Sequence, residues 1–448
     1  MHHRIIFFWA FVVALGGFLF GFDTAVISGA EQFIQQYWHL TPMEHGLTVS
    51  IALIGTVFGA LGGSIPSDRL GRKATLILVA LVFLLSAAGT ALATNWYFFL
   101  LCRFVGGLGV GASSVTAPVY ISEVAPAKYR GRMVALFQFN VVFGILVSYL
   151  SNYLIGLSGE GAWRLMLGIQ AVPSVLFLVL LRWVPESPRW LLLQGKREAE
   201  AVATLKVMNP LGYADDIAVI RQAQLNAVAG QQSDSRTSGE RLFTAKYRTP
   251  VMLAVLFALF NQVSGINAII YYAPRIFEMA GLAAGASLLS TVGIGVVNFL
   301  STLVAIRFID RIGRRRLMLI GTLGLIVTLG LVAYSFYQHT SGMLVVVSLL
   351  VYIAFFAFSQ GAVIWVFIAE IFPNQVRAKG QTLGSFTHWI MAAVIAFTFP
   401  YLAAGIGGGH IFSFFCLMMV IQLLFVLRWM PETKGKTLEE IEVGMMMH

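Results

Sequence analysis

Apolar runs of about 20 residues recur through the whole chain, and short polar segments separate them. A helix of that length spans the hydrocarbon core of a bilayer. Hydrophobic residues make up 58% of the chain and charged residues 11%, whereas soluble proteins carry about 25% charged residues. We therefore predict an all-α polytopic membrane protein with roughly twelve transmembrane helices. The spans are expected at approximately 5–30, 46–66, 74–93, 97–121, 131–155, 163–184, 249–279, 285–309, 317–337, 343–369, 378–402 and 409–430.

Three short phrases occur twice, at offsets of roughly 242 to 247 residues. They are Asp68–Lys73 with Asp310–Arg315, Glu123–Pro126 with Glu370–Pro373, and Pro185–Pro188 with Pro431–Lys434. Parallel duplication of a six-helix half is typical of alternating-access transporters. We expect an N-terminal half at 1–184, a cytoplasmic helical linker at 185–248, a C-terminal half at 249–430 and a cytoplasmic tail at 431–448.

The charges indicate how the chain is oriented. The net charge is +10, and nearly all Lys and Arg fall in loops that alternate along the chain. This is the positive-inside pattern, so both termini are expected in the cytoplasm and nucleic acid is not expected as a partner. Within the linker, Arg197–Met208 and Asp215–Val228 have helical patterns, and Gln231–Gly239 is expected to be flexible.

Seven motifs follow one another along the chain. They are Gly21–Asp23, the two Asp-Arg-Leu/Ile-Gly-Arg loops, Arg103 with its glycines, Pro118–Glu123, Pro185–Leu191, Gln262–Asn267 and Pro431–Gly435. In this order they make the chain similar to the sugar porter family of the major facilitator superfamily. Within that family the chain looks closest to bacterial xylose/proton and glucose/proton symporters and, more distantly, to facilitative glucose carriers. The resemblance spans essentially the whole chain and implies two pseudo-symmetric six-helix halves.

Asp23 and Arg103 lie inside apolar helices of the first half, where a charge costs about 2.5–3.5 kcal/mol. One acid and one base in the same half suggest an ion pair. Protonation of Asp23 would release Arg103 and change the packing of the first and fourth helices. The resemblance implies the same role, because family symporters carry a proton-binding acid in the first helix. A structural ion pair without proton transport is the alternative.

Further acid–base pairs lie at helix ends on the cytoplasmic side. Groups from both halves can bridge there when that side is closed, and a two-state bundle needs such reversible contacts. The resemblance implies a cytoplasmic salt-bridge lock of the outward-facing state, and helix capping with topology signals is the alternative. The residues are Asp68, Arg72, Glu123, Arg130, Asp310, Arg314, Glu370 and Arg377.

Sugar recognition needs neutral donors and acceptors and an aromatic face. Polar residues in the apolar helices are few, and those around Gly265 predict a break in the seventh helix. By resemblance, the sugar-contact positions are Gln138, Gln262, Asn267, Asn298, Trp365 and Trp389, Phe20 matches an apolar wall, and Tyr271 and Tyr272 match an extracellular gate. Asn261 and His388, polar residues of the same apolar helices, are further candidates for sugar binding. Interhelical hydrogen bonds or an interfacial aromatic belt are the alternative.

Three residues depart from the family pattern near the expected sugar. Asn261 shortens one arm of a Gln-Gln pair, and His388 stands where relatives carry Gln or Asn. Ala362 replaces a proline after Gly361 and is expected to stiffen the tenth helix. These departures bear on which sugar is carried.

The sequence favours proton-coupled import of a monosaccharide, a hexose or a pentose such as glucose, galactose or xylose, through the cell membrane. A passive uniporter of the same fold and a membrane sugar sensor remain alternatives. No nucleophile–base set stands out, so an enzyme is not expected. Cys102 and Cys416 lie in apolar runs and suggest no metal site, no cofactor is expected, and a monomer in the lipid bilayer is the expected form.

Overall fold

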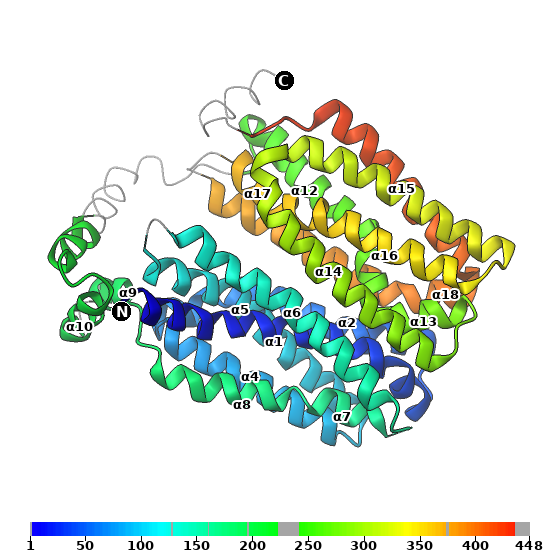
Figure 1. Ribbon diagram of the computed structural model, residues 1–448, viewed down its shortest axis with the longest axis horizontal. Coiled ribbons are helices and arrows are strands. Elements are labelled where there is room, and N and C mark those ends of the chain that lie inside the picture. The colour runs from blue at the N-terminus through cyan, green and yellow to red at the C-terminus, as the bar shows by residue number, and fades with distance from the viewer. Residues whose placement is uncertain are drawn as a thin grey trace.

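The computed structural model describes residues 2–126, 129–159, 161–194, 197–222, 242–372 and 376–434, with side chains from Arg4 onward and without those of Asp310 and Ala378. Nearly all of these residues are helical, and no β-strand occurs among them. The predicted all-α class is therefore confirmed. Figure 1 shows two groups of long helices, one from α1 to α8 and one from α12 to α18.

The first group consists of helices from the first 183 residues. In it α1 packs along α6, and α2 packs along α5. The elements are α1 (His2–Tyr37), α2 (Pro42–Gly62), α3 (Ser64–Arg69), α4 (Arg72–Leu92), α5 (Trp96–Val124), α6 (Arg130–Gly156), α7 (Ala162–Gly168), α8 (Ala171–Leu180) and the 3-10 turn η2 (Leu181–Trp183).

The second group begins after residue 242. In it α18 packs against α12 and α15, and α16 packs against α14 and α15. The elements are η4 (Ala245–Tyr247), α12 (Arg248–Val263), α13 (Ile266–Met279), α14 (Ala284–Ile312), α15 (Arg314–Gln338), α16 (Gly342–Phe358), α17 (Gln360–Ile371) and α18 (Arg377–Trp429).

The described residues form eleven helical segments that are long and apolar enough to cross a membrane. The last of them has 51 residues, which at 1.5 Å per residue is about 75 Å and more than twice the hydrocarbon thickness. Gly407 interrupts it with a non-helical backbone, φ 77° and ψ 164°. Because this break divides the last segment into two spans, the eleven segments correspond to the twelve expected spans. Large apolar side chains such as Leu85 and Leu154 stay exposed on the outer faces, as lipid contact requires.

One predicted boundary and one expectation about helix stiffness were wrong. The first span was expected to end at residue 30, but α1 continues to Tyr37, and Gln35 donates to the carbonyl of Leu40. The tenth span, Gly342–Ile371, agrees with its expected bounds, but Ala362 was expected to stiffen it. It breaks at Ser359, whose hydroxyl donates to the carbonyl of Phe355, a bond that bends helices. Ala362 does not prevent this break.

The segment between the groups contains α9 (Pro188–Gln194), α10 (Glu198–Met208) and a further helical stretch at 213–222. The helix expected at Arg197–Met208 is thus present, with Arg197 as its N-cap. The helix expected at Asp215–Val228 is described as far as residue 222. The predicted flexible tract Gln231–Gly239 lies outside the described residues.

The repeated phrases form the same structure twice. Glu186 accepts hydrogen bonds from the backbone N–H groups of Arg72 and Lys73, at the N-terminus of α4. Glu432 accepts from the N–H groups of Arg314 and Arg315, at the N-terminus of α15. Each carboxylate caps a helix that has no side-chain cap of its own and favours the positive end of its dipole. The duplication therefore conserves a capping unit that ties the end of each half to its own basic loop.

The basic loops, α9 and α10 lie at one end of the molecule, on the left of Figure 1. We call this the basic end and the other the distal end. The two groups meet along α2 with α18, α6 with α14, and α1 with α13.

The capping carboxylates make a prediction about stability. Glu186→Ala and Glu432→Ala each leave two or more helix N–H groups without their acceptor. Each change should therefore reduce the free energy of unfolding by about 1–3 kcal/mol. Thermal unfolding in detergent measures this, and Asp215→Ala, at an exposed position of the helical stretch 213–222, is the control. Equal melting temperatures for all three variants would contradict the capping role.

Candidate functional site

A polar cluster surrounds the break between α12 and α13. Gly265 separates the two helices with φ +89°, in the left-handed region that glycine tolerates. This is the predicted break. It brings Asn267 back toward Gln262, and Asn267 Nδ2 donates to Gln262 Oε1 at 2.5 Å. Gln262 Nε2 in turn donates to Asn261 Oδ1 at 2.9 Å. Three of the predicted sugar-contact residues therefore form one hydrogen-bonded set.

His388 of α18 joins this cluster. Its Nδ1 lies 3.1 Å from Gln262 Nε2, so an unprotonated Nδ1 accepts from the amide. The imidazole ring lies 4.7 Å from the ring of Trp365 on α17 and 5.0 Å from that of Trp389. Trp389 in turn lies 5.9 Å from Phe20 of α1. An aromatic wall thus runs from α17 through α18 to the opposite half of the molecule.

Gln138 and Asn298 lie apart from these contacts. Gln138 is exposed on α6 and Asn298 is half-buried on α14. Among the described residues neither has a side-chain hydrogen bond to the cluster. Their amides are therefore free to bind a ligand, and α6 and α14 are helices that pack against each other across the two halves.

Asp23 and Arg103 form an ion pair inside the first half. Arg103 Nη1 donates to Asp23 Oδ1 at 3.0 Å, and both side chains are at most 2% exposed. A cavity of about 10 Å³, the space of roughly one water, touches both residues. Tyr271 of α13 and Trp389 of α18 line the same cavity. The charged pair thus faces two residues of the other half, and one of them, Trp389, contacts His388 of the polar cluster.

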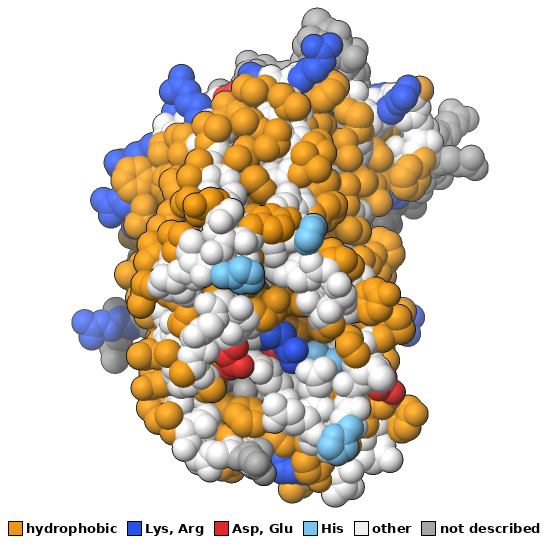
Figure 2. Space-filling view, turned by 90° about the vertical axis from the view of Figure 1, so that its right-hand side faces the viewer, with side chains coloured by type: hydrophobic (Ala, Val, Ile, Leu, Met, Phe, Trp, Pro, Cys, Tyr) orange, Lys and Arg blue, Asp and Glu red, His pale blue; other side chains and the backbone are white. Residues whose placement is uncertain are grey.

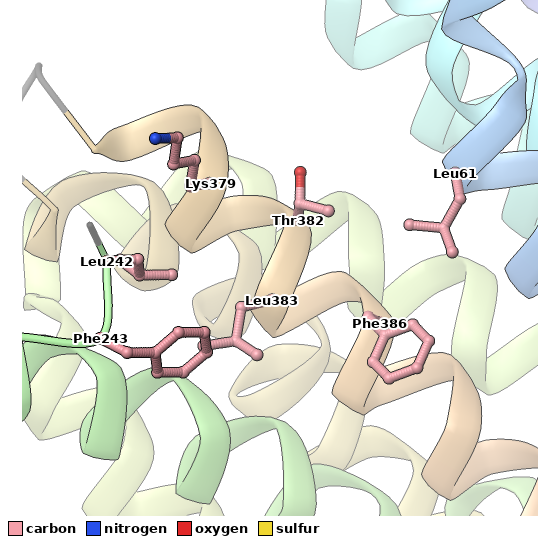
Figure 3. A pocket seen from close by; sticks show the side chains of 7 residues that line it. All are labelled: Leu61, Leu242, Phe243, Lys379, Thr382, Leu383 and Phe386. Carbon is pink, nitrogen blue, oxygen red and sulfur yellow. The ribbon is translucent and has the colours of Figure 1, made fainter. Parts of the chain in front are cut away.

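A larger cavity of about 800 Å³ opens between the halves toward the basic end. Figure 3 shows Lys379, Thr382, Leu383 and Phe386 along α18, with Leu61 of α2 on the other side. These α18 residues repeat at three- and four-residue spacing, so they share a helix face. Trp389 follows Phe386 by three residues on that face. The cavity wall therefore continues toward the aromatic wall and the ion pair.

The distal end is closed by contacts between the halves. The Tyr272 hydroxyl donates to the carbonyl of Ala396 within the second half, and its ring stacks on Phe399 at 4.9 Å. Between the halves, the Tyr149 hydroxyl of α6 donates to the carbonyl of Ile270. A Cβ on Gly46 of α2 would overlap the carbonyl oxygen of Phe397 on α18. Glycine is thus required where these two helices touch.

An ion pair also closes this end. Arg275 of α13 donates to both carboxylate oxygens of Glu31 on α1, at 3.0 and 2.7 Å. His45 of α2 contacts the same carboxylate at 2.5 Å, and Gln35 accepts from Arg275. Figure 2 shows the distal face, where acidic, basic and histidine side chains gather in a small central group among apolar ones.

Glu31 and His45 were not predicted as functional residues. Both are polar residues in apolar helices, the same signal that identified Asp23, but Glu31 fell just beyond the predicted end of the first span.

At the basic end the expected charged residues pair within each half. Arg72 lies 3.0 Å from both Asp68 and Glu123. Arg314 lies 2.8 Å from Glu370. Among the described side chains, no ion pair crosses between the halves at this end.

Two expected partners behave differently. Glu123 binds Arg72 rather than Arg130, which is exposed at the start of α6. Arg377 donates to the carbonyl of Phe372. The side chain of Asp310 lies outside the described residues.

Comparison with known proteins gives the family. The family model described as "Sugar (and other) transporter" matches residues 9–444. The chain belongs to the sugar transporter family. Family members include the D-xylose-proton symporter of Escherichia coli (strain K12), which is 35% identical over 476 residues and covers 98% of this chain and 95% of the relative. The glucose transporter GlcP of Staphylococcus epidermidis is 37% identical over 435 residues, 96% of this chain and 95% of the relative.

A solved structure of this family confirms the fold. The inward open conformation of the xylose transporter XylE from E. coli superposes with a TM-score of 0.86 at 33% identity. The match covers 98% of this chain and 99% of that one. The chain is therefore a multi-pass membrane protein with the major facilitator fold of this sugar transporter family, and its known relatives are transporters.

The Asp23–Arg103 pair predicts an asymmetry between single and double variants. Asp23→Ala leaves a buried guanidinium without a counter-charge and should cost about 3–5 kcal/mol of stability. Asp23→Asn combined with Arg103→Gln removes both charges and should recover most of that loss. Thermal unfolding in detergent reads both, with Asp68→Asn at an exposed position as control. A double variant no more stable than Asp23→Ala would contradict this account.

Proposed function

We propose that the protein imports a monosaccharide, a hexose or a pentose, together with a proton, by alternating access of the two halves around a midplane site. One observation carries this proposal: the Asp23–Arg103 pair shares its cavity with Tyr271 and Trp389, next to the polar cluster. A carboxylate that can bind a proton therefore lies beside the groups that would bind a sugar. The names of the relatives, a xylose-proton symporter among them, agree with it.

The proposed sugar site lies between the halves. Gln262, Asn267 and His388 offer amide and imidazole groups, and Asn261 holds Gln262 in place. Gln138 and Asn298 contribute the free amides of α6 and α14. Trp365, Trp389 and Phe20 supply apolar surfaces for the C–H groups of the ring. Neutral donors and acceptors with an aromatic wall suit a sugar better than an ion.

The proposed orientation follows from charge. The basic end faces the cytoplasm and the distal end faces outward across the cell membrane, with both termini in the cytoplasm. The open cavity at the basic end and the closed distal end then correspond to an inward-facing state. In the outward-facing state, Tyr271 and Tyr272 move as part of the extracellular gate. The charged residues of the basic end, which pair within each half here, then re-pair across the halves as a lock.

Proton coupling is proposed to act through Arg103. A proton on Asp23 neutralises the carboxylate, so Arg103 loses its counter-charge and α1 can shift against α5. Because Tyr271 and Trp389 line the same cavity, that shift reaches the gate helix and the sugar wall directly. Sugar binding and protonation would thereby favour the same rearrangement.

Coupling is tested in proteoliposomes with a pH indicator in the outer medium. The wild type should alkalinise the outer medium when glucose, galactose or xylose is added, because protons enter with sugar. Asp23→Asn should abolish alkalinisation while sugar counterflow continues. Counterflow without proton movement in the wild type, unchanged in Asp23→Asn, would leave a passive uniporter. Binding with no counterflow in either protein would leave a sensor.

The sugar site is tested by binding. Gln262→Ala and Gln138→Ala should each lose most sugar affinity while the fold is retained. Each lost neutral hydrogen bond costs about 0.5–1.5 kcal/mol, and more where a partner is left unpaired, as Asn267 would be. Calorimetry or thermal shift with each sugar measures the loss. Gln194→Ala, in the linker helix α9, is the control. Wild-type affinity in both site variants would refute the assignment.

A further inference from the structure

The charged group at the distal end has a distinctive arrangement. Among the described side chains, Arg275–Glu31 is the only ion pair that joins the two halves. Glu31 and His45 belong to α1 and α2 of the first half, and Arg275 belongs to α13 of the second. Glu31 and His45 are fully buried, whereas Arg275 is 22% exposed. The carboxylate therefore has one partner from each half.

In the closed arrangement, one positive charge is enough to balance the carboxylate of Glu31. Arg275 makes two hydrogen bonds to Glu31 and a third to Gln35, which balances the carboxylate. His45 Nε2 lies 2.5 Å from Glu31 and 3.5 Å from Arg275 Nη2. A second cation at that distance, inside the protein, would be repelled and poorly solvated. One proton on His45 Nε2, donated to Glu31, satisfies this contact.

The other described groups around His45 offer its ring no acceptor for a second proton. Its Nδ1 is buried and has no hydrogen-bond partner. The ring of Tyr272 on α13 lies 6.1 Å away, edge to face. Glu44, the neighbour of His45 on α2, is exposed and occupied by its capping bonds to Thr41. Glu278 interacts with Gln32 and is a further acid near Glu31 and Arg275, and it moves with Arg275 because both belong to α13.

Opening of the distal end changes the balance of charge around Glu31. Arg275 leaves with the second half, while Glu31 and His45 stay together in the first half. A carboxylate without its guanidinium is then left beside an imidazole, the side chain whose charge changes in the physiological pH range. A proton on His45 restores neutrality at that point.

We propose that Glu31 and His45 form a second proton-binding site, in which a proton on His45 and the guanidinium of Arg275 replace each other as the counter-charge of Glu31. The site fills from the distal side when that side opens and empties when it closes. It is separate from Asp23, whose partner Arg103 belongs to the same half and does not leave. The proposal rests on the alternating access proposed above, but not on sugar identity or on coupling through Asp23.

The test uses Gly46→Trp as a wedge, because the backbone of Gly46 touches the carbonyl of Phe397 across the closed end. Histidine side chains labelled with ¹⁵N are followed by NMR from pH 8 to 5.5 in the wild type and in Gly46→Trp. His45→Gln assigns the His45 signal. His39→Asn is the control, at an exposed left-handed turn that asparagine tolerates.

In the wild type, the His45 imidazole should stay neutral throughout this range. In Gly46→Trp it should become doubly protonated as the pH falls. If Gly46→Trp does not fold, Arg275→Gln removes the competing cation and should give the same protonation. A neutral His45 in the opened protein, or a protonated one in both proteins, would overturn the proposal.

A second readout measures the opening itself. Spin labels on the distal ends of α1 and α13 should report a ratio of open to closed molecules that rises by up to tenfold per unit fall in pH. His45→Gln should remove the part of this response that depends on the imidazole, whereas His39→Asn should retain the full response. An identical response in the wild type and His45→Gln would refute the site. Because neither readout involves sugar, loss of symport would leave both unchanged.

Discussion

Apolar surface provides little attraction between helices inside a bilayer, because lipid tails are as apolar as leucine. The contact between the two halves therefore depends on close backbone approach and on a few polar bonds. At the distal end, Gly46 lies against the carbonyl of Phe397, and Arg275 binds Glu31. At the basic end the described ion pairs stay within each half, and a cavity of about 800 Å³ remains. Among the described side chains, few polar contacts join the halves at the closed end, so few polar contacts need to change for it to open.

The charged and polar groups inside the protein are divided between the two halves. The second half has no counterpart of Asp23 and Arg103 at the repeat offset. The polar cluster around Gln262, in contrast, belongs mainly to the second half. One cavity of about 10 Å³ is lined by residues of both halves of the molecule. A change in the charge of Asp23 therefore acts directly on Tyr271 and Trp389 of the second half, because these residues line the same cavity.

The fold was largely predictable from the sequence, because in a bilayer every span must be an apolar helix. The break at Gly265 was predictable too, since glycine and polar residues interrupt an apolar run there. The break at Ser359 was not, because it depends on a hydroxyl bond to the preceding turn that many serines do not make. The length of α1 was also missed, since its last turns are stabilised by Arg275, some 240 residues away. The pairing of Glu123 with Arg72 rather than Arg130 likewise depends on the meeting of α4 and α5.

Two buried carboxylates on α1 now distinguish the two roles of a proton in the proposed cycle. Asp23 and Glu31 lie eight residues apart, about 12 Å along the helix. Arg103, the partner of Asp23, belongs to the same half, so opening does not separate this pair and, in the proposed cycle, a proton releases the arginine. Arg275, the partner of Glu31, belongs to the other half, so in the proposed cycle opening removes the arginine and His45 takes up a proton instead. A proton at the first site would drive the rearrangement, and a proton at the second would respond to it.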